Sequence, residues 1–396
     1  MSLDLAATVA AIRAVVGPRP GPVGLHEPWL AGREWEYVKS CLDEGWISSV
    51  GAFVDRFEND LAAYCGTARA VATVNGTAAL HTALMVLGVK PGDEVLVPAL
   101  TFVATANAVA HCGAVPHFVD SAPDTLGLCP ERLRDHLERL AVRGPNGPVN
   151  RHTGRRLAAV VPVHVFGHPV AADPLAEVAA HFELPIIEDA TEALGSLYHG
   201  RPAGGLGRIG VFSFNGNKIL TTGGGGMLVT DDASLADAAR HLTTTAKRPH
   251  PWAFEHDAVA YNYRLPNVNA AIGCAQLERL PLMIARKRRL AEAYRQALAE
   301  LPGLEVVPEP AGSRSNFWLN AVRLKADQAA RRDELLAATH AAGLMTRPAW
   351  TPMSHLPMYA DCPRADLTVT EDLVRRLVCL PSSAWLGAED GPEGGR

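Results

Sequence analysis

The stretch VFSFNGNKILTTGGGG, residues 211–226, joins an apolar strand to a polar turn that carries Lys218. Partial desolvation lowers the pKa of a lysine, and the neutral amine is the form that attacks an aldehyde. Four glycines at 223–226 leave space beside this nitrogen for a ligand, and Ser213 offers a hydroxyl near the end of the strand. The stretch predicts a reactive lysine at the edge of a buried sheet. A turn lysine before a glycine-rich hairpin is the plain alternative.

Outward from this strand, the chain alternates between short β-branched runs and segments with helical periodicity, which is the pattern of an α/β fold. Several of the runs are apolar almost throughout, as strands covered on both faces must be. We predict strands at Ala70–Val74, Glu94–Leu100, Val115–Asp120, Leu157–Val165, Leu184–Glu188, Gly210–Phe214 and Gly226–Thr230. We predict helices at Thr77–Leu87, Phe102–His111, Pro130–Val142, Pro174–Phe182 and Ser234–Thr245.

Two other predicted strands end in polar residues. Asn75-Gly76-Thr77 follows the first strand and opens a helix, whose free N–H groups and dipole make an anion site. Asp189 ends the strand of IIEDA, residues 186–190, at the sheet edge where ligands of parallel sheets bind. A carboxylate there suits a protonated pyridine nitrogen, in a hydrogen bond of about 1.5–3 kcal/mol. Ordinary helix capping is the alternative for either motif when it is taken alone.

Four separated motifs carry a family resemblance. They are NGTAAL (75–80), PALTFVATANA (98–108), EDATEALGS (188–196) and SFNGNK (213–218). Together they resemble the DegT/DnrJ/EryC1/StrS sugar aminotransferases, over about residues 45 to 380. The resemblance implies pyridoxal 5'-phosphate (PLP) as cofactor and PLP fold type I, the aspartate-aminotransferase-like fold. This fold has a mainly parallel seven-stranded sheet and a smaller α+β C-terminal domain.

The resemblance also implies roles for single residues. Lys218 matches the lysine that bonds covalently to the cofactor, and Asp189 matches the partner of the pyridine nitrogen. The phosphate cradle is matched by Gly76, Thr77 and Ser213.

Three further residues match less specific positions. Phe102 matches the residue that lies over the cofactor ring, although an ordinary core phenylalanine would look the same. Glu192 stands where the family often has glutamine or histidine near the cofactor hydroxyl, so its contact and charge are open. His164 matches a histidine often found near the substrate, and a satisfied buried histidine is its alternative.

The segment YNYRL, residues 261–265, matches a stretch that crosses a homodimer interface in this family. The resemblance implies composite active sites. Asn262 would contact the phosphate of the neighbouring subunit's cofactor, and Arg264 would lie near the substrate there. An internal hydrogen-bond network is the alternative, since buried polar groups need partners in either case.

A narrower resemblance points to the substrate. Residues 45–58, 164–170, 241–252 and 346–359 look like the branch that makes 4-amino sugars for bacillosamine or legionaminic acid. It implies a UDP-linked 2-acetamido-4-keto-6-deoxy hexose as amino acceptor and L-glutamate as donor. Lys247 and Arg248 supply cations for the diphosphate, unless they belong to a solvated loop.

Other functions stay open at this point. They are an aminotransferase for a dTDP- or GDP-linked ketosugar, a sugar dehydrase of the same fold, and a non-catalytic PLP-binding regulator. A dehydrase has histidine at the lysine position, which Lys218 argues against. A regulator would usually need an added DNA-binding module.

Composition excludes several partners. The net charge of −5 offers no broad basic face for nucleic acid or anionic membrane. The sequence contains no run of about 18 apolar residues, so it predicts no membrane span. The seven cysteines do not have the spacing of metal ligands, so we expect no metal site. We expect their thiols to be reduced, as in a cytoplasmic protein.

The chain changes character after about residue 275, where a charged helix at Ala285–Glu300 and another at Gln328–Ala342 are predicted. We therefore expect a large PLP-binding domain at 1–275, including the N-terminal segment, and a small domain at 276–396. The polar insertion at 143–156 is predicted to be a mobile surface loop, with an anion-contacting role as the alternative.

Overall fold

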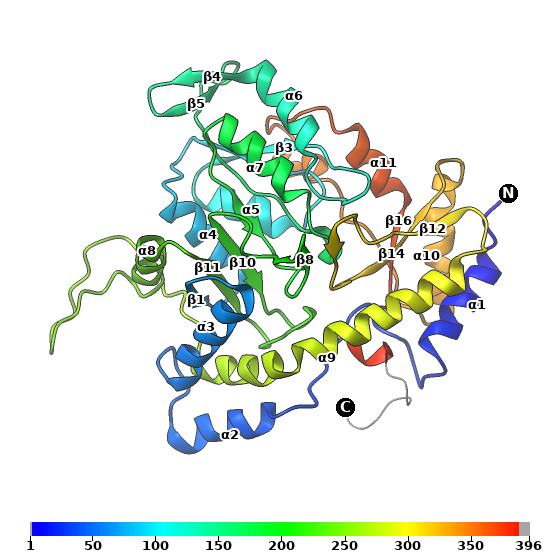
Figure 1. The fold of residues 1–396 in the computed structure, drawn as a ribbon, viewed down its shortest axis with the longest axis horizontal. Helices are drawn as coiled ribbons and strands as arrows, with labels where there is room; N and C mark the ends of the chain where they lie inside the picture. Colours follow the sequence, from blue (N-terminus) through cyan, green and yellow to red (C-terminus); the bar gives the residue numbers. More distant parts are fainter. Residues whose placement is uncertain (1, 388–396) are drawn as a thin grey trace.

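The computed structural model describes residues 2–387, and a seven-stranded sheet forms its centre (Figure 1). The strand order is β3-β2-β6-β7-β10-β11-β1, where single parallel bridges (Val160 to Ile186 and Val163 to Asp189) join β6 to β7. Only β11 runs antiparallel to its two neighbours. The predicted mainly parallel seven-stranded sheet is confirmed. Its strands are β1 (Arg69–Thr73), β2 (Glu94–Pro98), β3 (Val115–Val119), β6 (Leu157–Val160), β7 (Ile187–Asp189), β10 (Ile209–Ser213) and β11 (Gly226–Thr230).

Side chains that alternate along these strands enter two separate cores. Val71 and Val211 pack with helix α4 (Gly76–Val86) on one face of the sheet. Ala72 and Phe212 pack on the opposite face with α3 (Ala52–Cys65). Burial on both faces explains why the strands are apolar throughout. The other predicted helices form close to their expected bounds, as α5 (Val103–His111), α6 (Pro130–Leu140), α7 (Ala172–His181) and α8 (Ala233–Thr243).

Helix α9 differs most from the prediction. It runs over Asn267–Leu298 and contains Pro281, so the expected domain boundary at residue 275 falls inside a helix. The first half of α9 is buried by α3 and by α2 (Glu34–Glu44), neither of which was predicted. A helix buried on several sides has no amphipathic period by which to recognise it.

The smaller domain is a four-stranded antiparallel sheet with helices beside it. Its strand order is β12 (Leu304–Val306), β14 (Asn320–Leu324), β16 (Leu377–Leu380), β15 (Arg347–Pro348). Helices α10 (Arg332–Ala341) and α11 (Thr368–Arg376) pack against it. The N-terminal helix α1 (Leu5–Val16) joins this domain, because Ile12 and Val16 share a core with Val322 and Val378. We therefore propose that the N-terminal segment belongs to the smaller domain and not, as we expected, to the larger one.

The polar insertion at 143–156 is not the mobile surface loop that its composition predicted. It contributes to a β-hairpin of β4 (Ala141–Gly144) and β5 (Gly147–Asn150). The Arg156 guanidinium donates to the Asp93 carboxylate, and Asn150 donates to the buried carboxylate of Glu94. These bonds fix the insertion near the amino end of β2, whereas the site described below lies at the carboxyl ends of the strands. Across residues 2–387, no helix is both long and apolar enough to cross a lipid bilayer.

Candidate active site

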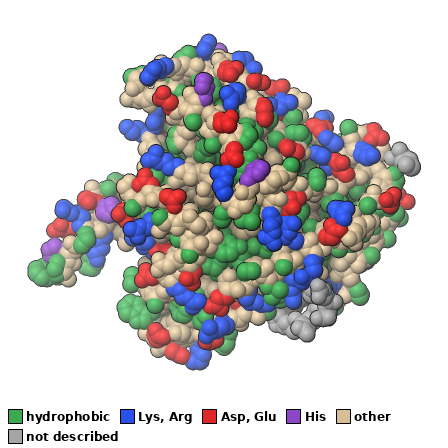
Figure 2. Space-filling view, viewed as in Figure 1, with side chains coloured by type: hydrophobic (Ala, Val, Ile, Leu, Met, Phe, Trp, Pro, Cys, Tyr) green, Lys and Arg blue, Asp and Glu red, His purple; other side chains and the backbone are tan. Residues whose placement is uncertain are grey.

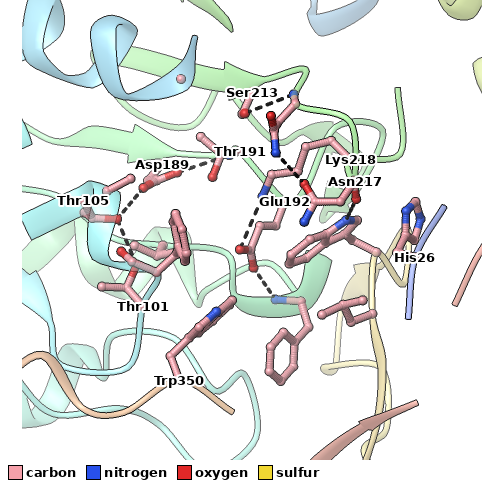
Figure 3. Close-up of a pocket in the computed structure, with 18 of the residues that line it drawn as sticks. His26, Thr101, Thr105, Asp189, Thr191, Glu192, Ser213, Asn217, Lys218 and Trp350 are labelled. Carbon is pink, nitrogen blue, oxygen red and sulfur yellow. Dashed lines mark hydrogen bonds and ion pairs between the residues drawn. The ribbon is translucent and has the colours of Figure 1, made fainter. Parts of the chain in front are cut away.

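A cavity of about 690 Å³ lies beyond the carboxyl ends of the parallel strands. Seven of the residues expected at the site line it, and Figure 3 shows several of them converging. They lie at or just after the carboxyl ends of β1, β2, β7 and β10, and they are Gly76, Thr77, Phe102, Asp189, Glu192, Ser213 and Lys218. The smaller domain closes the cavity with Trp318, Leu319 and residues 347–351.

The N-terminus of α4 forms one wall of the cavity. The Asn75 side chain accepts a hydrogen bond from the Ala78 N–H at 2.8 Å. The N–H groups of Gly76 and Thr77 precede the intrahelical hydrogen bonds and are free for an anion. A Cβ atom at residue 76 would lie 2.8 Å from the Ser213 Cβ. Only glycine lets this helix end approach β10 so closely, so Asn75 caps the helix while its first turn still offers an anion site.

Asp189 is buried at the end of β7, with an exposed fraction of 2%. Its Oδ2 accepts a hydrogen bond from the Thr105 hydroxyl at 2.8 Å, and Thr105 in turn contacts the Thr101 hydroxyl at 2.9 Å. Its Oδ1 accepts the Thr191 N–H at 3.2 Å. No helix begins directly after Asp189, since residues 190–196 are turns and irregular backbone, so the capping alternative is wrong for this residue. The threonines hold the carboxylate at one position in the cavity wall.

Lys218 lies between a carboxylate and an indole. Its Nζ is 3.6 Å from the Glu192 Oε1 and 4.0 Å from the centroid of the Trp318 ring. The Trp318 ring is itself held, since its Nε1 donates to the Asn217 carbonyl at 2.8 Å. This placement directs the lysine nitrogen into the cavity (Figure 3).

Glu192 is a carboxyl group that titrates near neutrality. Burial raises its pKa to about 7, and the neighbouring Lys218 partly opposes this shift. Its Oε2 accepts the Phe166 N–H at 2.9 Å. This carboxyl group can therefore be neutral or charged at physiological pH.

The expectation that His164 binds substrate is not supported. His164 is fully buried and does not line the cavity. Its Nε2 lies 2.7 Å from the Glu188 Oε1, and its Nδ1 accepts the Val170 N–H at 3.0 Å. Both ring nitrogens are satisfied inside the protein, which is the alternative reading of this histidine.

Arg264 also has an internal role. Its guanidinium is 7% exposed, lies 2.8 Å from the Glu58 Oε1 and donates to the Ala72 carbonyl at 2.9 Å. These contacts tie the start of α9 to β1. They engage the guanidinium within its own chain, so the structure does not support the expected substrate contact.

Asn262 and Lys247 lie outside the cavity of their own chain, on an arm formed by residues 244–262. Both residues are exposed, and the Lys247 Nζ lies 4.3 Å from the centroid of the Phe254 ring. The arm projects from the body between α8 and α9, and Figure 2 shows apolar and charged side chains gathered on it. Trp252, Phe254 and Val259 are each at least 80% exposed there.

Sequence reasoning missed several cavity residues, among them His26, Trp318 and Arg347. Arg347 and Trp350 fall within the quoted stretch 346–359, where an arginine beside aromatics was the available signal. His26 and Trp318 are single residues outside regular secondary structure, and no periodicity or motif marks them.

Comparison with known proteins identifies the family. Residues 29–392 match the family model described as "DegT/DnrJ/EryC1/StrS aminotransferase family". The chain belongs to this family. It is 40% identical to the GDP-perosamine synthase of Caulobacter vibrioides, over 93% of this chain and 95% of that protein.

Solved structures agree with this membership. The aminotransferase TlmJ from Streptoalloteichus hindustanus superposes with a TM-score of 0.82, at 33% identity, over 91% of this chain and 94% of that one. DesI, solved in the presence of its TDP-sugar product, gives a TM-score of 0.80 at 33% identity, over 94% and 91% of the two chains. The protein is thus a PLP-dependent aminotransferase of nucleotide sugars.

The cavity of this aminotransferase fits PLP. The close approach of Gly76 to Ser213 leaves the α4 N-terminus open to the cavity, where the phosphate would lie. The buried Asp189 carboxylate would hold the proton of the pyridine nitrogen, and the Lys218 amine would bond to the aldehyde carbon. Bound PLP supplies an electron-accepting ring, which stabilises negative charge on the substrate carbon.

Proposed function

We propose that this aminotransferase converts a UDP-linked 2-acetamido-4-keto-6-deoxy hexose to the 4-amino sugar, with L-glutamate as amino donor. The observation that carries the chemistry is the convergence of Lys218, Asp189 and the α4 N-terminus on one cavity. The likeness of residues 45–58, 241–252 and 346–359 to the bacillosamine and legionaminic acid branch supports this choice of sugar and nucleotide.

Lys218 acts as general base and acid in this proposal. In the donor half-reaction its Nζ would take up the proton from the donor α-carbon, and in the acceptor half-reaction it would deliver a proton to the sugar carbon that receives the amine. Asp189 keeps the ring nitrogen protonated, while Phe102, 53% exposed at the cavity, covers the ring face. Glu192 holds the Lys218 nitrogen in place at 3.6 Å.

Arg347 is the residue that we propose for a glutamate carboxylate. It is the one arginine among the described residues that line the cavity. Its Nη1 contacts the Thr346 carbonyl at 2.9 Å and the His340 Nε2 at 3.0 Å, which hold the guanidinium in position. A planar guanidinium matches a carboxylate in two parallel hydrogen bonds, which favours this pairing.

We further propose a homodimer with composite active sites. The support is the arm at 244–262, because exposed tryptophan, phenylalanine and valine side chains on a projecting hairpin favour burial against a second subunit. In the dimer, Asn262 would reach the partner's cofactor phosphate, and Lys247 with Arg248 would bind the diphosphate. The seven cysteines are all free, which supports a cytoplasmic location.

A GDP-linked 4-ketosugar is the second candidate acceptor. It is favoured by the 40% identity to a protein named GDP-perosamine synthase. The deciding experiment loads the enzyme with amine from glutamate and then adds UDP-, GDP- or dTDP-linked 4-ketosugars separately. The proposal expects the fastest discharge with the UDP-linked 2-acetamido sugar. Faster discharge by the GDP sugar would overturn the substrate while leaving the aminotransferase intact.

Two controls belong to that experiment. Release of 2-oxoglutarate on mixing with glutamate separates an enzyme from a non-catalytic PLP-binding protein. The Lys218→Ala variant should bind the cofactor without turnover, and continued turnover would remove Lys218 from its role.

A further inference from the structure

The segment 23–27 is fixed at the mouth of the cavity by backbone hydrogen bonds to the smaller domain. The Val23 N–H donates to the Gly343 carbonyl at 2.8 Å, and the Ser382 N–H donates to the Leu25 carbonyl at 2.7 Å. The Glu27 N–H donates to the Ser383 hydroxyl at 2.8 Å. These bonds flank His26 on both sides, so its backbone is held rigidly where the two domains meet.

The His26 ring lines the cavity but has no partner within the described chain. Neither of its ring nitrogens makes a hydrogen bond there, and no dashed line reaches the ring in Figure 3. Buried polar groups are nearly always hydrogen-bonded, so an unpaired imidazole at a cavity indicates a ligand group that completes it. A half-turn of the His26 ring about its Cβ–Cγ bond exchanges its carbon and nitrogen edges without changing the space that it fills. Its nitrogens can therefore face a ligand from either edge.

The surroundings of His26 keep it neutral. Burial lowers its pKa well below the usual value, and the Lys287 and Lys218 ammonium groups add to this effect. A neutral imidazole offers one N–H donor and one nitrogen acceptor. It therefore suits hydroxyl or amide groups, whereas the carboxylates of an amino donor require cations such as Arg347.

The ring also stands beside the reacting lysine. Its centroid is 6.4 Å from that of Trp318, and the Trp318 ring lies 4.0 Å from the Lys218 Nζ. A hexose whose ketone faces Lys218 would have its neighbouring ring substituents within reach of this wall.

We propose that His26 is a specificity-determining residue that hydrogen-bonds an uncharged substituent, a hydroxyl or acetamido group, of the acceptor hexose. This inference rests on the proposed function, because it requires a nucleotide-linked sugar in the cavity. It assigns His26 to the acceptor half-reaction alone.

The test compares wild type with His26→Ala, His26→Asn and His168→Asn. His168 is a matched control, since it is a buried histidine with an unpaired Nδ1 that does not line the cavity. Holoenzyme affinity is measured by calorimetry with UDP-N-acetylglucosamine and with GDP-mannose, which carry a hydroxyl where the ketone would be. Each half-reaction is then timed separately, and thermal unfolding checks that the variants fold.

For His26→Ala we expect about tenfold weaker binding of whichever probe the wild type binds, the effect of one lost neutral hydrogen bond. The acceptor half-reaction should slow to a similar degree, and the glutamate half-reaction should stay within about twofold. His26→Asn, which retains a donor and an acceptor, should recover part of the loss, and His168→Asn should match wild type.

The outcomes separate the two proposals. Wild type that binds neither probe and transfers no amine to any ketosugar would remove the proposed function. Wild type that is active, with unchanged acceptor kinetics in His26→Ala, would remove the role of His26 alone. Equal loss in both half-reactions would instead place the ring at the cofactor or the donor.

Discussion

At the scale of single residues, Glu192 is a buried carboxyl that meets the free Lys218 amine. Its pKa is about 7 in the folded chain, above the usual value of 4.5 for a glutamate side chain. Between these two values the folded chain keeps the proton while the unfolded chain releases it. The stability of the folded chain must therefore fall as the pH rises through this window.

Glu192→Gln should remove this dependence, because an amide does not titrate. With cofactor-free protein, we expect the free energy of unfolding of wild type to decrease relative to that of the variant between about pH 5 and about pH 8. Urea unfolding of both proteins across this range is the measurement. A constant difference between them would mean that Glu192 is already ionised at the acidic end.

Asp189→Asn tests the acid at the ring nitrogen. The variant should keep much of the cofactor affinity, since the α4 N-terminus and Ser213 are unchanged, but asparagine cannot stabilise a pyridinium. We expect the turnover rate to fall at least about a hundredfold, or roughly 2.7 kcal/mol of barrier. Steady-state rates at saturating cofactor decide the matter, and near wild-type turnover would point to another acid.

At the scale of elements, the predictable part of the site consists of strand ends. Gly76, Asp189 and Ser213 each adjoin a short apolar run, and the sheet topology brings such ends to one edge. His26 and Trp318 enter the cavity through contacts between the two domains, which no local pattern encodes. The buried first half of α9 was missed for a related reason, since only its second half alternates charged and apolar residues.

Lys287, in α9, connects these elements. It is fully buried, and its Nζ donates to the carbonyls of Trp318 (3.1 Å) and Ser382. Lys287→Met keeps an unbranched side chain that is one atom shorter, but leaves both carbonyls unpaired. We expect a loss of about 2–6 kcal/mol in the free energy of unfolding, from two buried acceptors at about 1–3 kcal/mol each. Denaturant titration measures it, with the exposed Lys39→Met as control; equal midpoints would show that water replaces the ammonium.

At the scale of the whole molecule, the arm at 244–262 and the cavity are complementary halves of the proposed site. The arm has exposed apolar side chains and cations, whereas the cations among the described residues that line the cavity are Lys218 and Arg347. A nucleotide diphosphate carries at least two negative charges, whereas our proposal already places Lys218 at the cofactor and Arg347 at the donor carboxylate. The cavity of one chain is therefore incomplete for a diphosphate. A second subunit that supplies Lys247 and Asn262 would complete the site.

Mixing two inactive chains tests this arrangement. One chain carries Lys218→Ala, and the other carries Asn262→Ala with Lys247→Ala. If the arm acts on the partner's cavity, one of the two sites in each mixed dimer combines a wild-type cavity with a wild-type arm, and activity returns after subunit exchange. If the arm served its own cavity, every site in the mixture would remain defective. Exchange is followed independently with a purification tag on one chain, so absence of recovery despite tagged heterodimers would count against action in trans. The Arg264→Lys variant is the comparison, because this residue precedes α9 and lies outside the arm. Its effect should appear in the free energy of unfolding, because the Arg264 guanidinium contacts Glu58 and Ala72 within its own subunit.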